Sequence, residues 1–279
     1  MTCCGWALAD RAVAADFAII IPARYASQRF PGKPLASLRG CDGEPRSLIQ
    51  RSWEAARAIA GDAGTWVATD DARIADAVHA LGGQVVMTPE SCRNGTERCA
   101  AALEVLGDIA PIVVNLQGDA PLTPDFVVDD LVAALRADSE AVMTTPAVRC
   151  SDTLYRHLVT DQANGRVGGT TVVFNAERRA LYFSKRVIPH VAEGRPDAHT
   201  QVHLHLGVYA YRPAALRAYV ATPPSPLEEL EGLEQLRFLE TGQLIRVVNF
   251  DPIGWDCIEL NNPQDIPAIE AVLRQRAIR

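Results

Sequence analysis

The chain has 279 residues, of which 48% are hydrophobic and 22% are charged, and its formal net charge is −7. This composition is typical of a soluble globular protein, and the length allows one or two domains with a full hydrophobic core. A nucleic-acid partner needs a basic face, so the negative charge argues against that class of partner. No window of about eighteen apolar residues occurs, which argues against a membrane-spanning helix.

The seven cysteines are an odd number without a CxxC pair, so neither a zinc site nor a disulfide framework is predicted. Scattered reduced thiols instead indicate a cytoplasmic protein. Residues 1–16 carry charges among alanines and lack a convincing signal-peptide pattern, so we expect a disordered or loosely packed leader. Residues 17–279 are predicted to form a single domain, because no linker rich in proline, glycine or serine divides them.

The stretch FAIIIPARYASQRFPGKPL, residues 17–35, carries the strongest local signal. Its apolar beginning, residues 17–21, predicts a buried parallel strand that ends at Pro22. The loop that follows places Arg24, Arg29 and Lys33 among small residues, which favours the binding of a polyanion. It matches neither GxGxxG nor GxxxxGK[ST], and a solvated basic turn is the alternative interpretation.

Helices and strands alternate in the part that follows. Apolar periodicity predicts helices over 47–60, 72–81 and about 95–106, and strands over 65–68, 84–87 and 112–116. This rhythm is typical of a parallel sheet with right-handed crossovers and flanking helices, as in an α/β fold. We expect this nucleotide-binding half to span about 17–140.

Two candidate site loops follow strands, after Ile21 and after Leu116, and so open on the same edge of the predicted sheet. Asp119 in the second loop is suited to a hard divalent cation such as Mg²⁺; capping of the next helix is the alternative. A triphosphate held by the basic loop, with Mg²⁺ on Asp119, would be arranged for in-line displacement at phosphorus.

The pattern changes from about residue 141 onward. Strands are predicted over 143–148, 169–175, 204–211 and 245–250, together with a helix over about 226–240. We expect antiparallel strands that extend the sheet and form the acceptor pocket and a dimer arm, in a second half of about 141–279.

Seven blocks of the sequence, in this order and spacing, resemble the 3-deoxy-manno-octulosonate (Kdo) cytidylyltransferase family, the CMP-Kdo synthetases. The blocks are FAIIIPARYASQRFPGKPL, WVATDDARI, NGTERCA, VVNLQGDAPL, ALYFSKRVIP, HLGVYAYR and PSPLEELEGLEQLR. The similarity covers about 17–272. It implies a nucleotidyltransferase-type α/β fold, usually a homodimer, that transfers CMP from CTP to an acidic sugar with Mg²⁺ and releases pyrophosphate.

The resemblance also implies roles for individual residues. Arg24 and Lys33 would be catalytic and hold the CTP phosphates. The nucleotide-binding set would comprise Arg24, Arg29, Lys33, Asn94, Gly95, Thr96 and Arg98. The acceptor-binding set would comprise Gln117, Lys185, His205, Tyr209, Glu234 and Gln235. Taken without the family, His205 and Tyr209 fit a strand core equally well, and Glu234 and Gln235 fit a helix surface.

The chain departs from the family pattern at several positions. The family usually has GDEP where this chain has GDAP, residues 118–121, and an aspartate as second metal ligand where this chain has Asn261. An amide oxygen still coordinates Mg²⁺, but the lost charge lowers affinity, and Glu259 is a possible substitute. Thr171 stands where the family tends to carry a lysine, and Lys185 where it tends to carry an arginine.

The sequence therefore predicts a CTP-dependent cytidylyltransferase with Kdo as the first choice of acceptor. The altered residues leave two alternatives open. One is CMP transfer to another acid, an amino-Kdo or a phosphonate such as phosphonoformate, in a specialised small-molecule pathway. The other is an inactive, nucleotide-binding regulatory paralogue.

Overall fold

The computed structural model describes residues 16–26, 29–192, 197–255 and 259–279. The predicted leader lies almost wholly outside these residues. No helix of the described part is long and apolar enough to cross a membrane.

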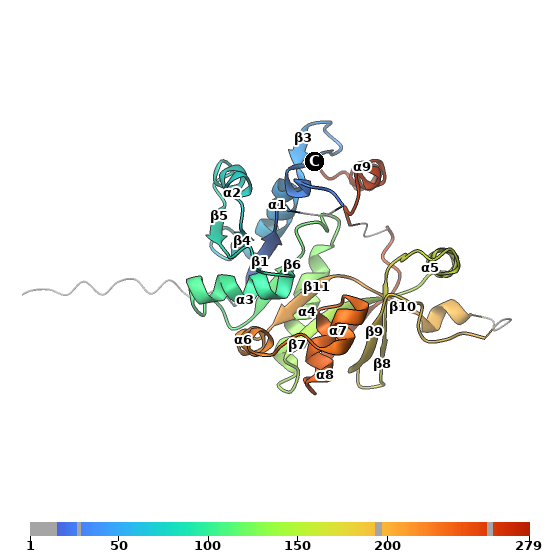
Figure 1. Cartoon of the computed structure of the whole chain (residues 1–279). Helices are drawn as coiled ribbons and strands as arrows, with labels where there is room; N and C mark the ends of the chain where they lie inside the picture. Colours follow the sequence, from blue (N-terminus) through green and yellow to red (C-terminus); the bar gives the residue numbers. More distant parts are fainter. Residues whose placement is uncertain (1–15, 27–28, 193–196, 256–258) are drawn as a thin grey trace, which may run out of the picture.

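The first half is built on four parallel strands in the order β5-β4-β1-β6 (Figure 1). The strands are β1 (Ala18–Ala23), β4 (Thr65–Thr69), β5 (Gln84–Met87) and β6 (Val113–Leu116). They alternate with α1 (Leu48–Ala60), α2 (Ala72–His79) and α3 (Gly95–Leu106). The predicted parallel sheet with flanking helices is confirmed.

Strand β1 is apolar throughout because both of its faces are buried. Ile20 belongs to the core under α3, α6 (Pro213–Ala221) and α8 (Gln235–Glu240). Ile19 and Ile21 belong to the core on the opposite face, under α1, α2 and α4 (Asp125–Ala137). The strand thus lies in the middle layer of a three-layer arrangement.

The predicted end of this strand at Pro22 is wrong, because β1 continues to Ala23 beside β4. Strand β6 pairs only with Ala18–Ile20. Beyond Ile20, this side of β1 has, within the described part of the chain, no hydrogen bonds to a neighbouring strand that Pro22 could interrupt.

The second half continues the same sheet with antiparallel strands, as predicted, except that the predicted strand over 245–250 is parallel to its neighbour. Strand β11 (Val208–Tyr211) runs antiparallel to β6, and β7 (Met143–Arg149) follows it. The sheet then extends through β10 (His203–His205), β8 (Thr170–Phe174) and β9 (Ala180–Ser184), while β12 (Ile245–Phe250) pairs in parallel with β7. Both predicted halves contribute strands to this one sheet, to which the described residues supply ten strands.

Two predicted elements are each divided in the structure. The strand expected over 204–211 is broken at Leu206–Gly207, and its two parts, β10 and β11, both pair with β7. The helix expected over 226–240 is two short helices, α7 (Pro226–Glu231) and α8, separated at Gly232, whose φ of 62° is left-handed. Both breaks bring side chains to the large cavity described below.

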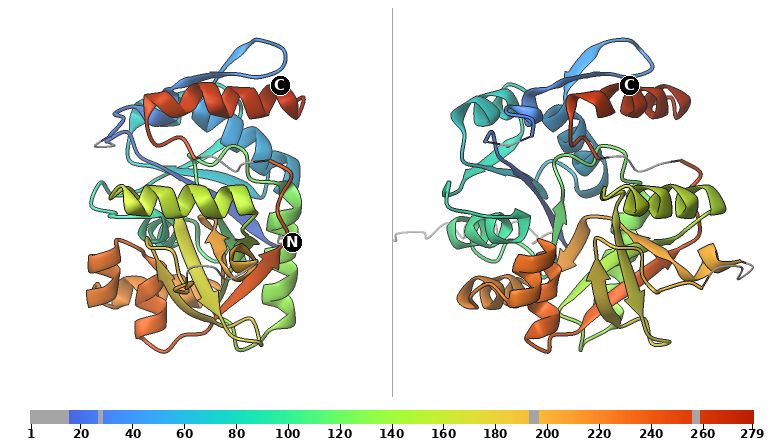
Figure 2. Two further views of the ribbon diagram at one scale, coloured as in Figure 1. Left: turned by 90° about the vertical axis from the view of Figure 1, so that its right-hand side faces the viewer. Right: turned by 45° about the vertical axis from the view of Figure 1, so that its right-hand side comes forward.

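The last helix, α9 (Ile266–Gln275), returns to the first half of the chain and packs near the hairpin of β2 (Ser37–Arg39) and β3 (Pro45–Ser47) (Figure 2). Its Ile269 and Leu273 share a core with Leu38, Leu48 and Leu260. The chain just before α9 is thereby held beside the loops after β1 and β6. The remaining elements are α5 (Asp152–Ala163) and the short 3-10 turns η1 (Lys33–Leu35), η2 (Ala198–Gln201) and η3 (Pro263–Asp265).

Candidate active site

A cavity of about 1710 Å³ opens at the carboxyl ends of β1 and β6. With one exception, Thr96, every residue that the sequence predicts for the site lines this cavity. The lining set includes Arg24, Arg29, Lys33, Asn94, Gly95, Arg98, Gln117, Asp119, Lys185, His205, Tyr209, Glu234, Gln235, Glu259 and Asn261.

The basic loop after β1 folds back on itself before η1. The Gly32 amide donates to the carbonyl of Tyr25 at 3.0 Å, and Gly32 has a left-handed φ of 73°. A Cβ at Gly32 would lie 3.0 Å from the Tyr25 hydroxyl, so glycine is needed for this close turn. The turn presents Lys33 toward the loop after β6, while Arg24 and Arg29 remain exposed at the cavity.

Lys33 and Asp119 meet between these two loops. The Lys33 Nζ lies 2.6 Å from Asp119 Oδ2, and both side chains are largely shielded. The loop of Asp119 is fixed because the Ser52 hydroxyl donates to the Gly118 carbonyl at 3.0 Å and the Leu260 amide donates to the Asp119 carbonyl at 2.8 Å. The cation and the carboxylate are therefore held on a rigid edge of the sheet.

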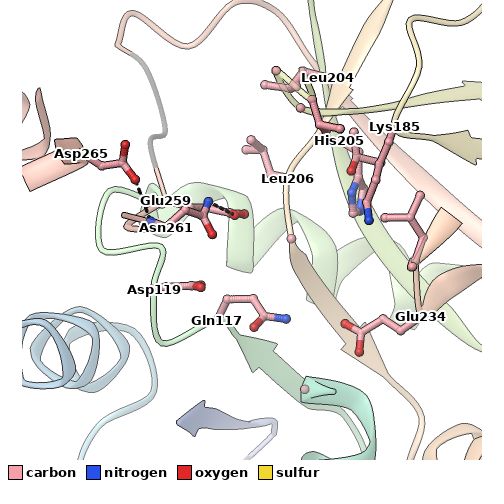
Figure 3. A pocket seen from close by; sticks show the side chains of 18 of the residues that line it. Gln117, Asp119, Lys185, Leu204, His205, Leu206, Glu234, Glu259, Asn261 and Asp265 are labelled. Atoms are coloured by element: carbon pink, nitrogen blue, oxygen red, sulfur yellow. Dashed lines mark hydrogen bonds between the residues drawn. The ribbon is translucent and has the colours of Figure 1, made fainter. Parts of the chain in front are cut away.

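The segment before α9 supplies oxygen atoms to the same place (Figure 3). Asn261 Oδ1 accepts a hydrogen bond from Arg29 Nη2 at 2.9 Å, and Asn261 Nδ2 donates to Glu259 Oε2 at 3.4 Å. Burial, together with the negative charge of Asp119, raises the pKa of Glu259 above its usual value. Two carboxylates and one amide oxygen thus converge beside the basic loop, which is a set of hard donors suited to Mg²⁺.

The start of α3 forms another wall of the cavity. Asn94 is its N-cap, and its Oδ1 accepts from the Glu97 amide at 2.8 Å. A Cβ at Gly95 would lie 3.0 Å from Gln117 Nε2, so the missing side chain lets Gln117 approach the helix start. The sequence predicts free backbone N–H groups at this helix start, but the Glu97 amide already donates to Asn94 Oδ1 and the Thr96 amide to Glu234 Oε2, so these two amides are not presented to a bound anion.

Two residues of that loop are placed differently from the prediction. Thr96 is fully buried, and its hydroxyl shares a 2.8 Å hydrogen bond with the Tyr211 hydroxyl, so the Thr96 side chain faces the core. Arg98 reaches the cavity wall, but its Nη1 donates to Thr88 at 2.7 Å and its Nη2 to Asp70 at 2.8 Å. Arg98 is thus committed mainly to a buried ion pair.

The predicted acceptor residues lie along the opposite part of the cavity, where Figure 3 shows Gln117, Lys185, His205 and Glu234 around the open space. Tyr209 donates to Gln235 Oε1 at 3.3 Å, and Gln235 Nε2 has no hydrogen-bond partner among the described residues. Glu234 accepts from the Thr96 amide at 3.1 Å, and burial raises its pKa. A polar acceptor with hydroxyl groups would satisfy these buried groups.

His205 is buried, and its protonation follows from its partner. The Thr145 hydroxyl donates its one proton to the Val208 carbonyl at 2.9 Å, so it must accept from His205 Nε2–H at 2.8 Å. Nδ1 is then the unprotonated acceptor. Burial lowers the pKa of His205 to about 3, so the imidazole is neutral at physiological pH.

Comparisons with known proteins agree with this geometry. The sequence profile described as Cytidylyltransferase matches residues 18–245. The 3-deoxy-manno-octulosonate cytidylyltransferase of Maricaulis maris is 46% identical over 254 residues, which cover 91% of this chain and 95% of that protein. The chain belongs to the 3-deoxy-manno-octulosonate cytidylyltransferase family.

Two further relatives support the same family. The mitochondrial 3-deoxy-manno-octulosonate cytidylyltransferase of Arabidopsis thaliana is 38% identical over 92% of this chain and 83% of its own length. A solved structure of CMP:2-keto-3-deoxy-manno-octonic acid synthetase complexed with CTP superposes with a TM-score of 0.78 at 33% identity, covering 94% of this chain and all of that one. The predicted enzyme class, a CTP-dependent cytidylyltransferase, is confirmed.

The surroundings of two departures from the expected family pattern, Thr171 and Lys185, accommodate the residues that this chain carries. Thr171 is buried, donates to the Arg186 carbonyl at 2.6 Å and accepts from the Ile188 amide at 3.1 Å, so it fixes the segment that carries Lys185. A Cβ at Gly232 would lie 2.9 Å from Lys185 Nζ, so the glycine between α7 and α8 leaves room for this ammonium group.

The sequence analysis missed Glu228, which also lines the cavity. Its carboxylate accepts from the Ser225 amide at 3.3 Å, which is one half of a capping box at the start of α7, and pairs with Arg237 Nε at 2.6 Å. A serine followed three residues later by a glutamate is the known signature of such a box, and it is present in PSPLEE, residues 224–229.

The neutral His205 gives a pH prediction. Its pKa is about 3 in the folded protein against an ordinary value of 6.5, so the unfolded chain binds the additional proton as pH falls below 6.5. The free energy of unfolding should therefore decrease by about 2 kcal/mol more between pH 7.5 and 5.0 in the wild type than in His205→Gln. Urea unfolding of both proteins at the two pH values measures this difference, and equal decreases would contradict a buried neutral imidazole.

Proposed function

We propose that this enzyme transfers CMP from CTP to 3-deoxy-manno-octulosonate. The observation that carries the proposal is the cavity itself, which has three cations and converging carboxylates at one end and buried hydrogen-bonding groups at the other. The first end suits a triphosphate with Mg²⁺, and the second suits a polyhydroxylated acid. The relatives named for this reaction support the choice of acceptor.

In this mechanism the acceptor hydroxyl oxygen attacks the α-phosphorus of CTP, and the bond from that phosphorus to the pyrophosphate oxygen breaks. Arg24, Arg29 and Lys33 hold the phosphates and stabilise the charge that develops on the leaving pyrophosphate. The proton of the attacking hydroxyl is released to solvent or buffer. Catalysis by this chain is then mainly positioning and neutralisation of charge.

The acceptor wall has an orienting function. Gln117, Gln235 and the neutral His205 supply donors and acceptors without bringing a further negative charge toward the triphosphate. Lys185 adds a cation at the far side, where it suits the carboxylate of an acidic acceptor.

Asp119, Glu259 and Asn261 are the residues that we expect to hold Mg²⁺. Asp119 and Asn261 stand at the two metal positions of the family pattern, and Glu259 restores the carboxylate that Asn261 lacks. The Glu259 side chain, which is longer than that of an aspartate, fits because residue 207 is a glycine. A Cβ at Gly207, at the break between β10 and β11, would lie only 3.3 Å from Glu259 Oε1. When bound, Mg²⁺ supplies neutralisation of phosphate charge.

The reaction is tested by measuring pyrophosphate release with CTP, Mg²⁺ and a panel of acids. We expect turnover with 3-deoxy-manno-octulosonate and release of one pyrophosphate per CMP-linked product. Turnover only with amino-Kdo or phosphonoformate would overturn the acceptor and keep the reaction. CTP binding without turnover of any acid would indicate a regulatory nucleotide-binding protein.

Lys33→Ala tests the phosphate end of the site. Because Lys33 is the shielded cation between the two loops, its loss should lower kcat/KM by about 100-fold or more. Asp119 stays partly accessible to solvent, so the fold should persist, as circular dichroism would verify. Arg57→Ala, which removes an exposed cation on α1 outside the cavity, serves as the control. Near-normal turnover of Lys33→Ala would remove Lys33 from the mechanism.

The metal assignment is tested with Glu259→Gln and Asn261→Asp. Loss of a carboxylate in the first variant should raise the Mg²⁺ concentration for half-maximal activity roughly tenfold, and the added carboxylate in the second should lower it. Binding of Mn²⁺ followed by electron paramagnetic resonance gives a readout that does not depend on turnover. Unchanged Mn²⁺ affinity in Glu259→Gln would exclude Glu259 as a ligand.

A further inference from the structure

A buried series of hydrogen bonds links the start of α3 with α6, α7 and α8. Asn94 Nδ2 donates to the Tyr219 hydroxyl at 2.8 Å, and that hydroxyl donates to Glu228 Oε1 at 2.8 Å. Arg237 then donates through Nε and Nη2 to the two oxygens of Glu228 at 2.6 and 2.7 Å. Tyr219 and Arg237 are each 1% exposed, so water does not compete for these bonds.

The ionised state of Glu228 fixes the direction of each hydrogen bond in this series. Burial raises the pKa of Glu228, but the hydrogen bonds from Arg237 and Tyr219 have the larger combined effect and lower its pKa below the usual value. The Glu228 carboxylate is therefore ionised and can only accept hydrogen bonds. The single proton of the Tyr219 hydroxyl must therefore go to Glu228, and its oxygen must accept from Asn94 Nδ2. This leaves Asn94 Oδ1 to cap α3 through the Glu97 amide. The orientation of the Asn94 amide is thus imposed by Tyr219.

Arg237 forms the far end of this series of hydrogen bonds and is itself hydrogen-bonded to α6. Its Nη1 donates to the carbonyls of Tyr219 and Thr222, both at 3.0 Å, near the end of α6. Its guanidinium carbon also lies 3.8 Å from the centroid of the Tyr219 ring. A two-point contact between arginine and a carboxylate fixes geometry as well as charge, so Tyr219 is held by both its ring and its hydroxyl.

A second tie joins the same elements. The Thr96 amide donates to Glu234 Oε2 at 3.1 Å, and Glu234 lies between α7 and α8 beside Gln235. The segment that contains α6–α8 is therefore hydrogen-bonded to the start of α3 at both Asn94 and Thr96. Asn94, Gly95, Glu234 and Gln235 all line the cavity, the first two at the end that we propose for the nucleotide and the last two at the end that we propose for the acceptor. These two hydrogen bonds therefore connect the two proposed ends of the cavity directly.

We propose that Tyr219 is a positioning residue that orients Asn94 for CTP binding. Through this contact it also holds the start of α3 in a fixed position relative to Glu234 and Gln235. Tyr219 is not among the described residues that line the cavity, so it acts through Asn94 and does not touch substrate. The inference rests on the proposed function in one respect, that the Asn94–Gly95 turn lies against the nucleotide.

Tyr219→Phe tests the proposal because it removes only the hydroxyl. The ring still stacks on Phe238, at a centroid distance of 5.0 Å, and still faces Arg237. Loss of one buried hydrogen bond to Asn94 should weaken CTP binding roughly three- to tenfold, measured by isothermal titration calorimetry with Mg²⁺ and no acceptor. The KM for CTP should rise by a similar factor, with a smaller change in kcat.

Tyr182→Phe is the matched control. Its hydroxyl also donates to a glutamate of α7, Glu231, at 3.5 Å, but this pair has no link to Asn94. CTP affinity of the control should stay within about twofold of the wild type. Unchanged CTP affinity in Tyr219→Phe, or an equal loss in both variants, would overturn the proposal.

The double variant Tyr219→Phe with Asn94→Ala separates positioning from general destabilisation. If Tyr219 acts through Asn94, the double variant should bind CTP no more weakly than Asn94→Ala alone. Additive losses would show that Tyr219 acts by another route and would contradict the inference. Because CTP binding needs no acceptor, a wild-type enzyme that binds CTP but does not use 3-deoxy-manno-octulosonate would overturn the acceptor and leave this inference standing.

Discussion

The site depends on the close approach of two loops that follow neighbouring parallel strands. A Cβ at Gly118 would lie only 2.9 Å from the carbonyl oxygen of Pro22, so the loop after β6 can lie against the end of β1 only because residue 118 is glycine. This contact places Asp119 beside Lys33. The remaining parts of the site are arranged around that pair.

Charged groups of both signs lie close together in this region. Lys33 faces Asp119 and Arg29 faces Asn261. Glu259 lies next to Asn261, and burial together with the negative charge of Asp119 raises the pKa of Glu259. The aspartate that the family usually carries at position 261 would have added a charge beside Arg29. In this chain we propose that Glu259, two residues earlier, supplies a carboxylate to Mg²⁺, and the absent side chain of Gly207 leaves room for it.

The acceptor side is organised by breaks in regular structure. The interruption between β10 and β11 places His205 and Tyr209 on either side of Gly207, with their rings 5.5 Å apart. The interruption between α7 and α8 places Glu234 and Gln235 at the cavity, and the buried chain through Tyr219 and Arg237 ties this turn to α3. The start of α3 and the turn between α7 and α8, which we propose to contact the nucleotide and the acceptor, are thereby connected by hydrogen bonds.

The sequence by itself determined the parallel half of the fold, and it predicted many of the residues that line the cavity. The apolar run of β1 and the helix–strand rhythm report burial on both faces of a sheet, and Arg24, Lys33 and Asp119 follow strands, where parallel topology gathers loops at one edge. Only the tertiary structure decided the breaks at Gly207 and Gly232, the burial of Thr96 and the pairing of Arg98 with Asp70. Local periodicity is the same for a continuous and an interrupted element, and the partner of a side chain depends on residues far away in the chain. For that reason Tyr219, 125 residues beyond Asn94, could be connected to the nucleotide wall only through the fold.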